Sequence, residues 1–333
     1  MSRYEYLLSG IQQNNFVIVG RAGMDFFADP PGTKTEEGSD FKAALGGSAA
    51  NTAAGICKFG GNAALVTSVS DDSIGRYCLN QLKQYGVGTQ YVKSVGGEYR
   101  NSLAVYESRV EDHQSVIYRN GAADFQMSED DVSEVEYNDF GALLTAGTVF
   151  AAEPSRTAAF KAFELASKAG IPVIFDVDYR PYSWPSSQVA EETLSRAADQ
   201  CDMIVGNDEE FGFMAGGLDK GLEKARALSK DNGVLVVYKM GPKGAITFQN
   251  GEEIQTGIYK VDALKPTGAG DSFMAGLLAS LAAGKDLRSS ILRGSACAAI
   301  TVTKPGCAPA MPFPEELELF LTDHPGPYLS EEL

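Results

Sequence analysis

Apolar residues fall into short, nearly continuous runs that alternate with longer amphipathic stretches. The runs have strand length and lie at 16–20, 63–70, 142–147, 172–178, 202–207 and 233–241. Helical segments are expected between them at 51–59, 74–85, 156–168, 189–198 and 222–228. Continuous apolar strands that alternate with helices are typical of a parallel sheet covered on both faces. The pattern therefore predicts an α/β fold.

Two early stretches break this pattern. Residues 28–42 are polar and rich in glycine and proline, and residues 99–118 alternate in polarity around a polar turn near Asp112. Such alternation indicates a β-hairpin. We interpret both stretches as a small β-sheet lid over the main domain, and the alternative is a pair of edge strands of the main sheet.

Composition narrows the class of protein. The 333 residues, 44% of them hydrophobic, suffice for one large domain or for one domain with a small appendage. The net charge of −16 argues against nucleic acid and anionic lipid as partners, so an anionic substrate would need a local positive pocket. The five cysteines form no CxxC pair, which indicates a reducing cytoplasm without structural zinc. We expect neither a signal peptide nor a membrane span.

The segment "PTGAGDSFMAG" at 266–276 introduces a helix predicted to start near Asp271. Gly268, Ala269 and Gly270 leave backbone N–H groups free at the positive end of that helix, which makes an anion site. The segment is not a Walker P-loop, because GxxxxGK[ST] is absent. Phosphoryl transfer needs an acceptor for the hydroxyl proton, and Asp271 is the candidate base. The alternative is a helix cap.

Two polar residues stand out near the beginning of the chain. In "ALGGSAANTAAG", Gly46 and Gly47 permit a tight turn, and Asn51 is the only sizeable polar side chain of the following helix start. Asn has no propensity reason to lie inside a helix, so Asn51 is a candidate ligand for hydroxyl groups. Asp25 follows the first strand, where open α/β sheets bind ligands. It is either a hydroxyl acceptor or a turn or N-cap residue.

Three further strand ends carry polar residues. Arg180 is suited to gripping a carboxylate or phosphate, and the alternative is an ion pair with Asp176 or Asp178. Asn207 and Glu210 are spaced to hold a hydrated Mg²⁺ through water, although a capping box is the better local interpretation. Lys239, Gly241 and Gly244 are a candidate backbone shelf for nucleotide phosphate, and a lone glycine pair is weak evidence for it.

Taken together, "GGSAANTAAG" and "PTGAGDSFMAG" resemble the ribokinase-like (PfkB) carbohydrate kinase family over nearly the whole chain. The resemblance implies a doubly wound, mostly parallel sheet in one kinase domain over 1–333, with a β lid from about 28–42 and 99–120. It also implies ATP, Mg²⁺ and often a homodimer joined through the lids. The implied roles are as follows: Asp271 as base; Gly268, Ala269 and Gly270 as anion hole; Asp25, Gly47 and Asn51 for the sugar; Lys239, Gly241, Gly244, Ala296 and Ala299 for the nucleotide.

A finer similarity lies in "GRAGMD", "DVDYRPYSW" and "AMPFPEEL", which resemble the branch of inositol catabolism. That branch phosphorylates the terminal hydroxyl of a deoxy keto sugar acid, 5-dehydro-2-deoxygluconate, whose carboxylate would give Arg180 and Arg21 a purpose. Related branches act on 2-dehydro-3-deoxygluconate, fructose or ribose. The sequence departs from many family members at Lys265, where an acid normally contributes to a monovalent-cation site. An ammonium group there predicts weak potassium dependence.

Two rival functions remain at this point. A dinucleotide-binding oxidoreductase would need a GxGxxG motif after the first strand, and "GRAGMD" lacks one. A sugar-binding regulator would have kept the fold and lost catalysis. The intact Gly268–Asp271 segment and the Asn207–Glu210 pair favour a working enzyme.

Overall fold

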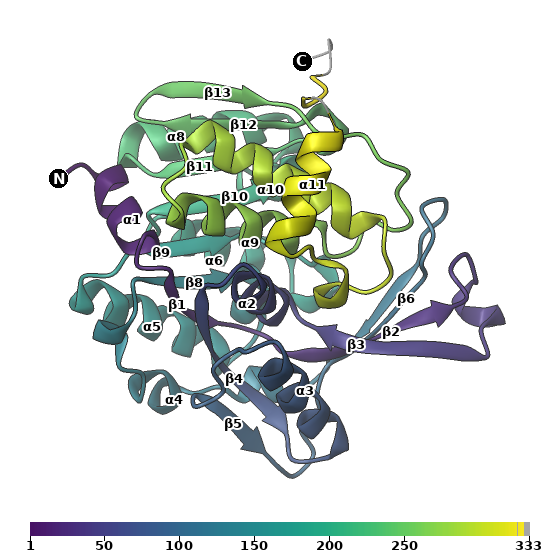
Figure 1. The fold of residues 1–333 in the computed structure, drawn as a ribbon. Coiled ribbons are helices and arrows are strands. Elements are labelled where there is room, and N and C mark those ends of the chain that lie inside the picture. The colour runs from purple at the N-terminus through teal and green to yellow at the C-terminus, as the bar shows by residue number, and fades with distance from the viewer. Residues whose placement is uncertain (325, 330–333) are drawn as a thin grey trace.

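A nine-stranded sheet forms the centre of the computed structural model, which describes residues 1–324 and 326–329 (Figure 1). Its order is β13-β12-β11-β10-β9-β8-β1-β4-β5, and all pairs from β5 to β11 are parallel. The strands are β1 (Asn15–Val19), β4 (Asn62–Ser70), β5 (Val92–Val95), β8 (Ala142–Ala146), β9 (Val173–Asp176), β10 (Met203–Asn207), β11 (Leu235–Lys239), β12 (Ala245–Gln249) and β13 (Glu252–Thr256). The six predicted strands are all present, and β12 and β13 extend the sheet in antiparallel fashion.

Helices cover both faces of the sheet, as the apolar pattern predicts. One face carries α4 (Glu129–Ser133), α5 (Ser155–Ala169), α6 (Ser187–Ala198), α7 (Asp208–Met214) and α8 (Gly221–Asn232). The other carries α1 (Arg3–Ile11), α2 (Ser48–Lys58), α3 (Ser73–Gln84), α9 (Ala269–Ala282) and α10 (Leu287–Val302), with α11 (Pro314–Asp323) packed outside α10. The doubly wound fold is confirmed. No helix among the described residues is long and apolar enough to cross a membrane.

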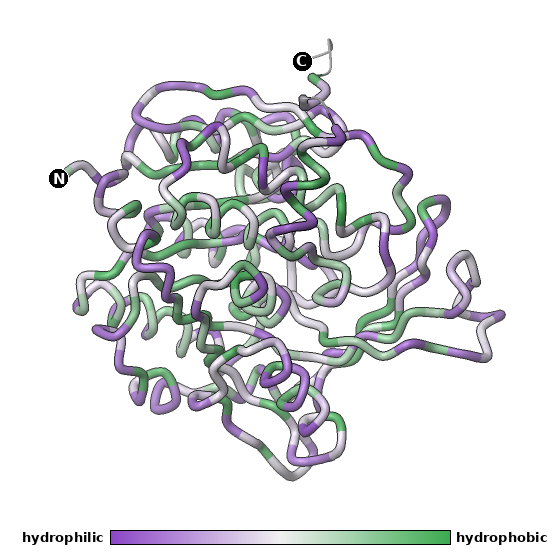
Figure 2. Tube along the Cα trace, in the orientation of Figure 1, coloured by the Kyte–Doolittle hydropathy of each residue, from purple (hydrophilic) through white to green (hydrophobic). Residues whose placement is uncertain are grey.

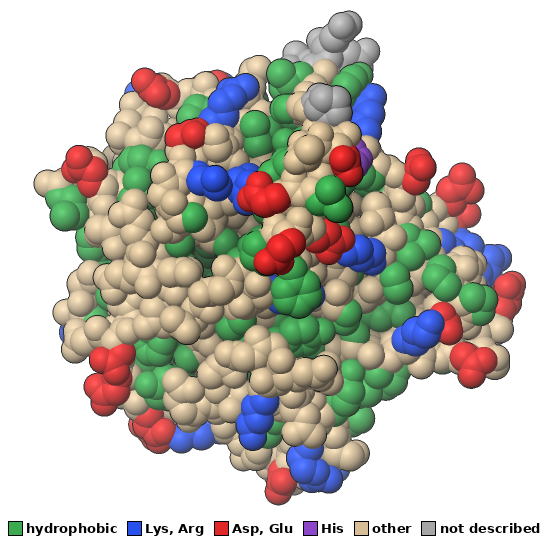
Figure 3. Space-filling view, in the orientation of Figure 1, with side chains coloured by type: hydrophobic (Ala, Val, Ile, Leu, Met, Phe, Trp, Pro, Cys, Tyr) green, Lys and Arg blue, Asp and Glu red, His purple; other side chains and the backbone are tan. Residues whose placement is uncertain are grey.

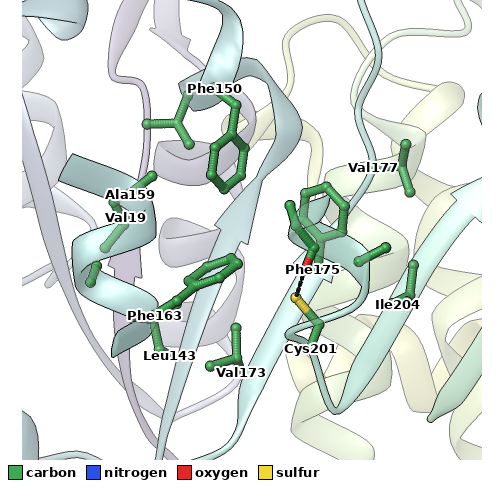
Figure 4. Close-up of a cluster of buried hydrophobic side chains, with 14 of the residues drawn as sticks. Val19, Leu143, Phe150, Ala159, Phe163, Val173, Phe175, Val177, Cys201 and Ile204 are labelled. Carbon is green, nitrogen blue, oxygen red and sulfur yellow. Dashed lines mark hydrogen bonds between the residues drawn. The ribbon is translucent and has the colours of Figure 1, made fainter. Parts of the chain in front are cut away.

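Side-chain alternation along the strands supplies both cores. In β1, Val17 and Val19 pack against the α5 side, whereas Phe16 and Ile18 pack against the α2 side. The hydropathy of the chain follows this arrangement, with hydrophobic residues along the inner strands (Figure 2). Figure 4 shows part of the α5 side, where the Phe150 ring meets the Phe175 ring nearly edge-on at 6.0 Å. Such edge-to-face pairs add to the stability of the apolar core.

The lid is a separate four-stranded sheet in the order β3-β2-β6-β7. Its strands are β2 (Gly23–Asp29), β3 (Asp40–Gly46), β6 (Leu103–Tyr106) and β7 (Ser115–Tyr118). The alternative of edge strands in the main sheet is therefore wrong. The lid includes residues 23–27 and 43–46, which lie outside the predicted lid segments, because β2 and β3 pair over seven residues. It projects from the main body beside α3 (Figure 1).

Candidate active site

A cavity of about 1760 Å³ lies where the carboxyl ends of the parallel strands meet the root of the lid. This is the edge at which open α/β sheets bind ligands. Nearly every residue predicted for chemistry lines it, although these residues come from seven separate segments of the chain. They are Arg21, Asp25, Gly47, Asn51, Arg180, Asn207, Glu210, Lys239, Gly241, Gly244, Gly268, Ala269, Gly270, Asp271 and Ala299.

Ala296 is the exception among the predicted residues. It is fully buried in an apolar cluster with Tyr259, Ala299 and Leu317, and it does not line the cavity. The lining residues of α10 are Ser295, Ala298, Ala299 and Val302, which follow helical spacing. The prediction placed two alanines three positions apart at the nucleotide, and the phase of the helix brings only Ala299 there.

Helix α9 begins earlier than the sequence predicts, and this changes the position of Asp271. The first helical residue is Ala269, and Gly268 precedes it in the left-handed region at φ 82°. Asp271 is therefore in the first helical turn and is not the N-cap, because no side chain caps this helix. The residues of that turn line the cavity, and the Lys239 ammonium lies 3.7 Å from the position that a Cβ on Gly270 would occupy. The helix start thus presents free N–H groups beside a cation, as an anion site requires.

Asp271 is held by a residue 220 positions away. The Asn51 amide donates a hydrogen bond of 2.9 Å to Asp271 Oδ2. Removal from water raises the pKa of Asp271 to about 6, Asp178 adds to that rise, and Asn51, Arg180 and Lys239 oppose it. A carboxylate with this pKa is ionised at neutral pH and still accepts a proton readily, which suits a general base.

Asp25 lies in β2 at the root of the lid, so the alternatives of a turn residue or an N-cap are wrong. Its side chain is buried, and Oδ1 has no hydrogen-bond partner among the described residues. Burial raises the pKa of Asp25 to about 7, although the Arg21 charge opposes this. Gly46 makes room for the carboxylate, since a Cβ there would lie 2.0 Å from Asp25 Oδ1. An unpartnered buried carboxylate in a cavity is expected to bind hydroxyl groups of a ligand.

Two acids lie at the end of β9, and they differ in their side-chain partners. Asp178, at φ 35°, pairs with Arg180 at 2.7 Å and accepts a 2.6 Å bond from the Ser48 hydroxyl. The predicted alternative for Arg180, an ion pair with Asp178, is thus present. Asp176 has no side-chain hydrogen bond in the described part of the chain, and burial raises its pKa to about 8 against the pull of Lys239.

Asn207 and Glu210 form the capping box that local reasoning favours. Asn207 Oδ1 accepts from the Glu210 N–H at 2.8 Å, and Glu210 Oε2 accepts from the Asn207 N–H at 2.7 Å. Burial also raises the pKa of Glu210, with Lys239 and Arg180 opposing. Over the described residues, no cluster of three His, Cys, Asp or Glu side chains has metal-binding geometry. Arg180 lies 3.9 Å from Glu210, yet the Glu210 charge adds to the rise in the pKa of Asp176, and such a pair of acids fits a hydrated divalent cation.

Lys265 is completely buried below the loop that leads into α9. Its ammonium donates to the carbonyl of Thr267 at 2.5 Å and approaches the carbonyl of Thr301 at 3.4 Å. Burial lowers the pKa of Lys265, while nearby Cys307, Asp271 and Asp25 act in the other direction. A positive charge therefore lies against two backbone carbonyls next to the segment 268–270.

Sequence reasoning missed two residues of the cavity that have clear roles in its structure. Arg119 follows the predicted hairpin and forms a buried ion pair with Asp124. Ser48 directly follows the glycine pair and bonds Asp178, as described above. Only the position of Ser48 beside two glycines hinted at this, because Asp178 is 130 residues away.

A buried carboxylate beside a glycine-rich helix start, at the carboxyl edge of a doubly wound sheet, is the arrangement expected of an α/β phosphotransferase. The chain belongs to the pfkB family of carbohydrate kinases, whose family model matches residues 13–314. It is therefore a sugar kinase.

Individual relatives agree with this assignment. A 5-dehydro-2-deoxygluconokinase of Photobacterium profundum is 35% identical over 92% of this chain and 94% of its own length. That of Bacillus subtilis is 34% identical over 91% of this chain and 94% of its own length. Among solved structures, a Vibrio cholerae fructokinase double mutant with fructose, ADP and potassium ion bound has a TM-score of 0.79 and 25% identity, covering 92% of this chain and 98% of that one.

Proposed function

We propose that this kinase transfers a phosphoryl group from ATP to the terminal hydroxyl of a sugar acid, 5-dehydro-2-deoxygluconate. The observation that carries the proposal is the Asp271 carboxylate, fixed by Asn51 at 2.9 Å beside the free N–H groups of α9. The activity for which the Photobacterium profundum and Bacillus subtilis relatives are named supports the choice of substrate. Kinases for 2-dehydro-3-deoxygluconate, fructose or ribose remain the alternatives to be tested.

Each part of the cavity has a role in this proposal. The substrate oxygen forms a bond to the γ-phosphorus, the bond to the β,γ-bridging oxygen breaks, and the hydroxyl proton passes to Asp271. The N–H groups of the 268–270 segment stabilise the negative charge of the transferring phosphoryl. Asp25, Gly47 and Asn51 contact the sugar. Lys239, Gly241, Gly244 and Ala299 contact the nucleotide.

Magnesium is expected at the acidic side of the nucleotide region. Glu210 and Asn207, already joined in a capping box, would hold the ion through water, with Asp176 as the nearby free acid. The ion would neutralise phosphate charge during the transfer. A monovalent cation is not expected to be required, because the Lys265 ammonium already supplies a positive charge to the Thr267 carbonyl.

One assay separates the candidate functions. ATP turnover is measured with sugars and sugar acids offered singly, with and without Mg²⁺. Asp271→Asn should lower kcat by roughly 10²- to 10⁴-fold, the usual contribution of general base catalysis. Asp231→Asn, a change at an exposed position of α8, is the matched control. Full activity of the Asp271→Asn protein would refute the base assignment, and tight sugar binding without turnover in the unmodified protein would support the regulator.

Assembly and location complete the proposal. The lid exposes Phe41, Val116 and Tyr118, which are 39%, 45% and 63% accessible, and Figure 3 shows hydrophobic side chains along it. A homodimer through the lids would cover them. Light scattering on the 35.4 kDa chain should then give twice that mass, and Tyr118→Asp should reduce it. All five cysteines are free thiols, which agrees with a reducing cytoplasm.

A further inference from the structure

Three arginines line the cavity, and two of them are neutralised by the protein itself. Arg180 pairs with Asp178 at 2.7 Å. Arg119 bonds Asp124 through Nε at 3.0 Å and donates through Nη1 to the Thr148 carbonyl at 2.9 Å. A guanidinium in such a pair offers little to an anionic ligand, because the ligand would have to compete with the built-in carboxylate.

Arg21 is the third arginine, and its situation differs. Its side chain is only 7% exposed, and within the described residues that side chain makes one hydrogen bond, from Nη1 to the Ser102 hydroxyl at 2.9 Å. Within the described part of the chain, no carboxylate oxygen lies within 4.0 Å of it. A guanidinium carries five N–H donors, so most of those of Arg21 lack a protein acceptor. Burying a charge in this way is unfavourable unless a ligand supplies the counter-charge.

The backbone fixes the place of this guanidinium. Gly23 leaves room for it, since a Cβ there would lie 2.8 Å from Arg21 Nη1. The Arg21 carbonyl packs against Gly47, where a Cβ would approach to 2.3 Å. Both glycines flank the region around Asp25 and Asn51 at the root of the lid. Arg21 is therefore held rigidly on the sugar side of the cavity.

The charges around the base locate Arg21 further. The cations that act most on the pKa of Asp271 are Arg180 and Lys239. Arg21 instead acts on Asp25 and Asp178. Arg21 lies just before β2, the strand that carries Asp25, and its guanidinium bonds Ser102 next to β6, so it lies at the root of the lid beside the proposed sugar contacts. Arg21 and Asp271 line the same cavity, so one substrate can offer a hydroxyl to Asp271 and a carboxylate to Arg21.

We propose that Arg21 binds the carboxylate of the substrate and selects sugar acids over neutral sugars. This assignment rests on the proposed sugar-acid kinase function and sharpens it, because it separates Arg21 from Arg180, which the sequence could not distinguish. A planar guanidinium with free N–H groups binds a carboxylate through two parallel hydrogen bonds. The competing explanation is a structural role, with Arg21 balanced at longer range by Asp25 and Asp178.

The test compares two substrates across variants. The substrates are 5-dehydro-2-deoxygluconate and its carboxamide, which has a similar shape and no charge. Arg21→Met should raise KM for the acid by roughly 10- to 100-fold, the value of a hydrogen bond to a charged group, and change KM for the carboxamide little. Arg21→Lys, which keeps the charge without the planar fork, should fall between. Arg76→Met, at an exposed position of α3, is the matched control.

The possible results separate the two proposals. Equal losses on acid and carboxamide would overturn the role of Arg21 and leave the kinase function standing. An unmodified enzyme that phosphorylates neutral sugars and rejects sugar acids would overturn the substrate class together with this assignment. Should Arg21→Met fail to fold, the same ratio is measured with Arg21→Lys. Thermal stabilisation of that variant by the acid and by the carboxamide then gives a second readout, and equal retention of both stabilisations would refute the contact.

Discussion

The hydrogen bond from Asn51 to Asp271 gives a prediction that can be worked from the structure. Asn51→Leu keeps a side chain of similar size and removes the amide that donates to Asp271 Oδ2 at 2.9 Å. The bond stabilises the ionised carboxylate, so its loss raises the pKa of Asp271. A hydrogen bond to a charged group is worth about 1.5–3 kcal/mol, and one pKa unit corresponds to about 1.4 kcal/mol. The pKa should therefore rise from about 6 by roughly one to two units.

The assay is the pH dependence of kcat/KM between about pH 5 and 9. The unmodified enzyme should lose activity below a pKa of about 6. In the Asn51→Leu enzyme this acid limb should lie near pH 7–8, and at pH 7 only about a quarter of the base would be ionised for a pKa of about 7.5. Lost sugar contacts would lower activity at every pH, so the position of the limb is the diagnostic quantity and its height is not.

Asn80→Leu is the control, because Asn80 lies on the exposed face of α3. Its acid limb should match that of the unmodified enzyme. An Asn51→Leu limb that stays in place or moves to lower pH would refute the reasoning. It would mean either that Asp271 is not the titrating base or that Asn51 does not stabilise its charge.

Three further predictions concern other parts of the site. Burial raises the pKa values of Asp25 and Asp176 to about 7 and about 8 from 3.8, so the stability they contribute is complete below the unfolded value and is lost as pH rises through the folded values. The melting temperature of the unliganded protein should fall between about pH 5 and 8, less so in Asp176→Asn, and a rise over this window would contradict the burial argument. In Gly46→Ala, the new Cβ would lie 2.0 Å from Asp25 Oδ1 and displace that carboxylate. The sugar KM should rise roughly 5- to 100-fold, while ATP binding measured by calorimetry stays unchanged. An unaltered KM would show that Asp25 does not contact the sugar. Replacing potassium by tetramethylammonium should leave kcat nearly unchanged, whereas Lys265→Met should lower it at saturating substrate, and a strong potassium requirement in the unmodified enzyme would argue against Lys265 as the resident cation.

The sheet was predictable where burial makes a strand apolar along its whole length. The inner strands β1, β4, β8, β9, β10 and β11 are of this kind. β13 was not predicted, because only one of its five residues, Thr256, is buried. β12 was not predicted either, although four of its five residues are buried, so burial alone did not decide the outcome. The start of α9 was displaced by two residues, since the sequence marks a glycine-rich entry without showing which glycine is left-handed.

For the site, sequence reasoning located segments but not partners. Each strand end was identified from its polar residues, and parallel topology then brings those ends together. The bond between Asn51 and Asp271 joins residues 220 positions apart, so no local pattern contains it. Which of Ala296 and Ala299 lines the cavity depends on the rotation of α10 about its axis, which the sequence does not show. Assigning the carboxylate-binding role to Arg21 or to Arg180 depends on which of them is paired with Asp178, and the sequence does not show this.

The cavity has an acidic nucleotide side and a positively charged sugar side, whereas the chain as a whole is acidic. On the nucleotide side, the acids Asp176, Asp178 and Glu210 outnumber the cations Arg180 and Lys239, and burial raises the pKa values of Asp176 and Glu210. A divalent cation would relieve that excess. On the sugar side, no carboxylate oxygen of the described residues lies within 4.0 Å of Arg21. A chain with a net charge of −16 repels an anionic substrate at long range, so binding one requires a local cation that the protein has not already neutralised. Both ends are therefore unfavourable when empty, and each is matched by a ligand of the opposite charge, as expected of a kinase for a sugar acid.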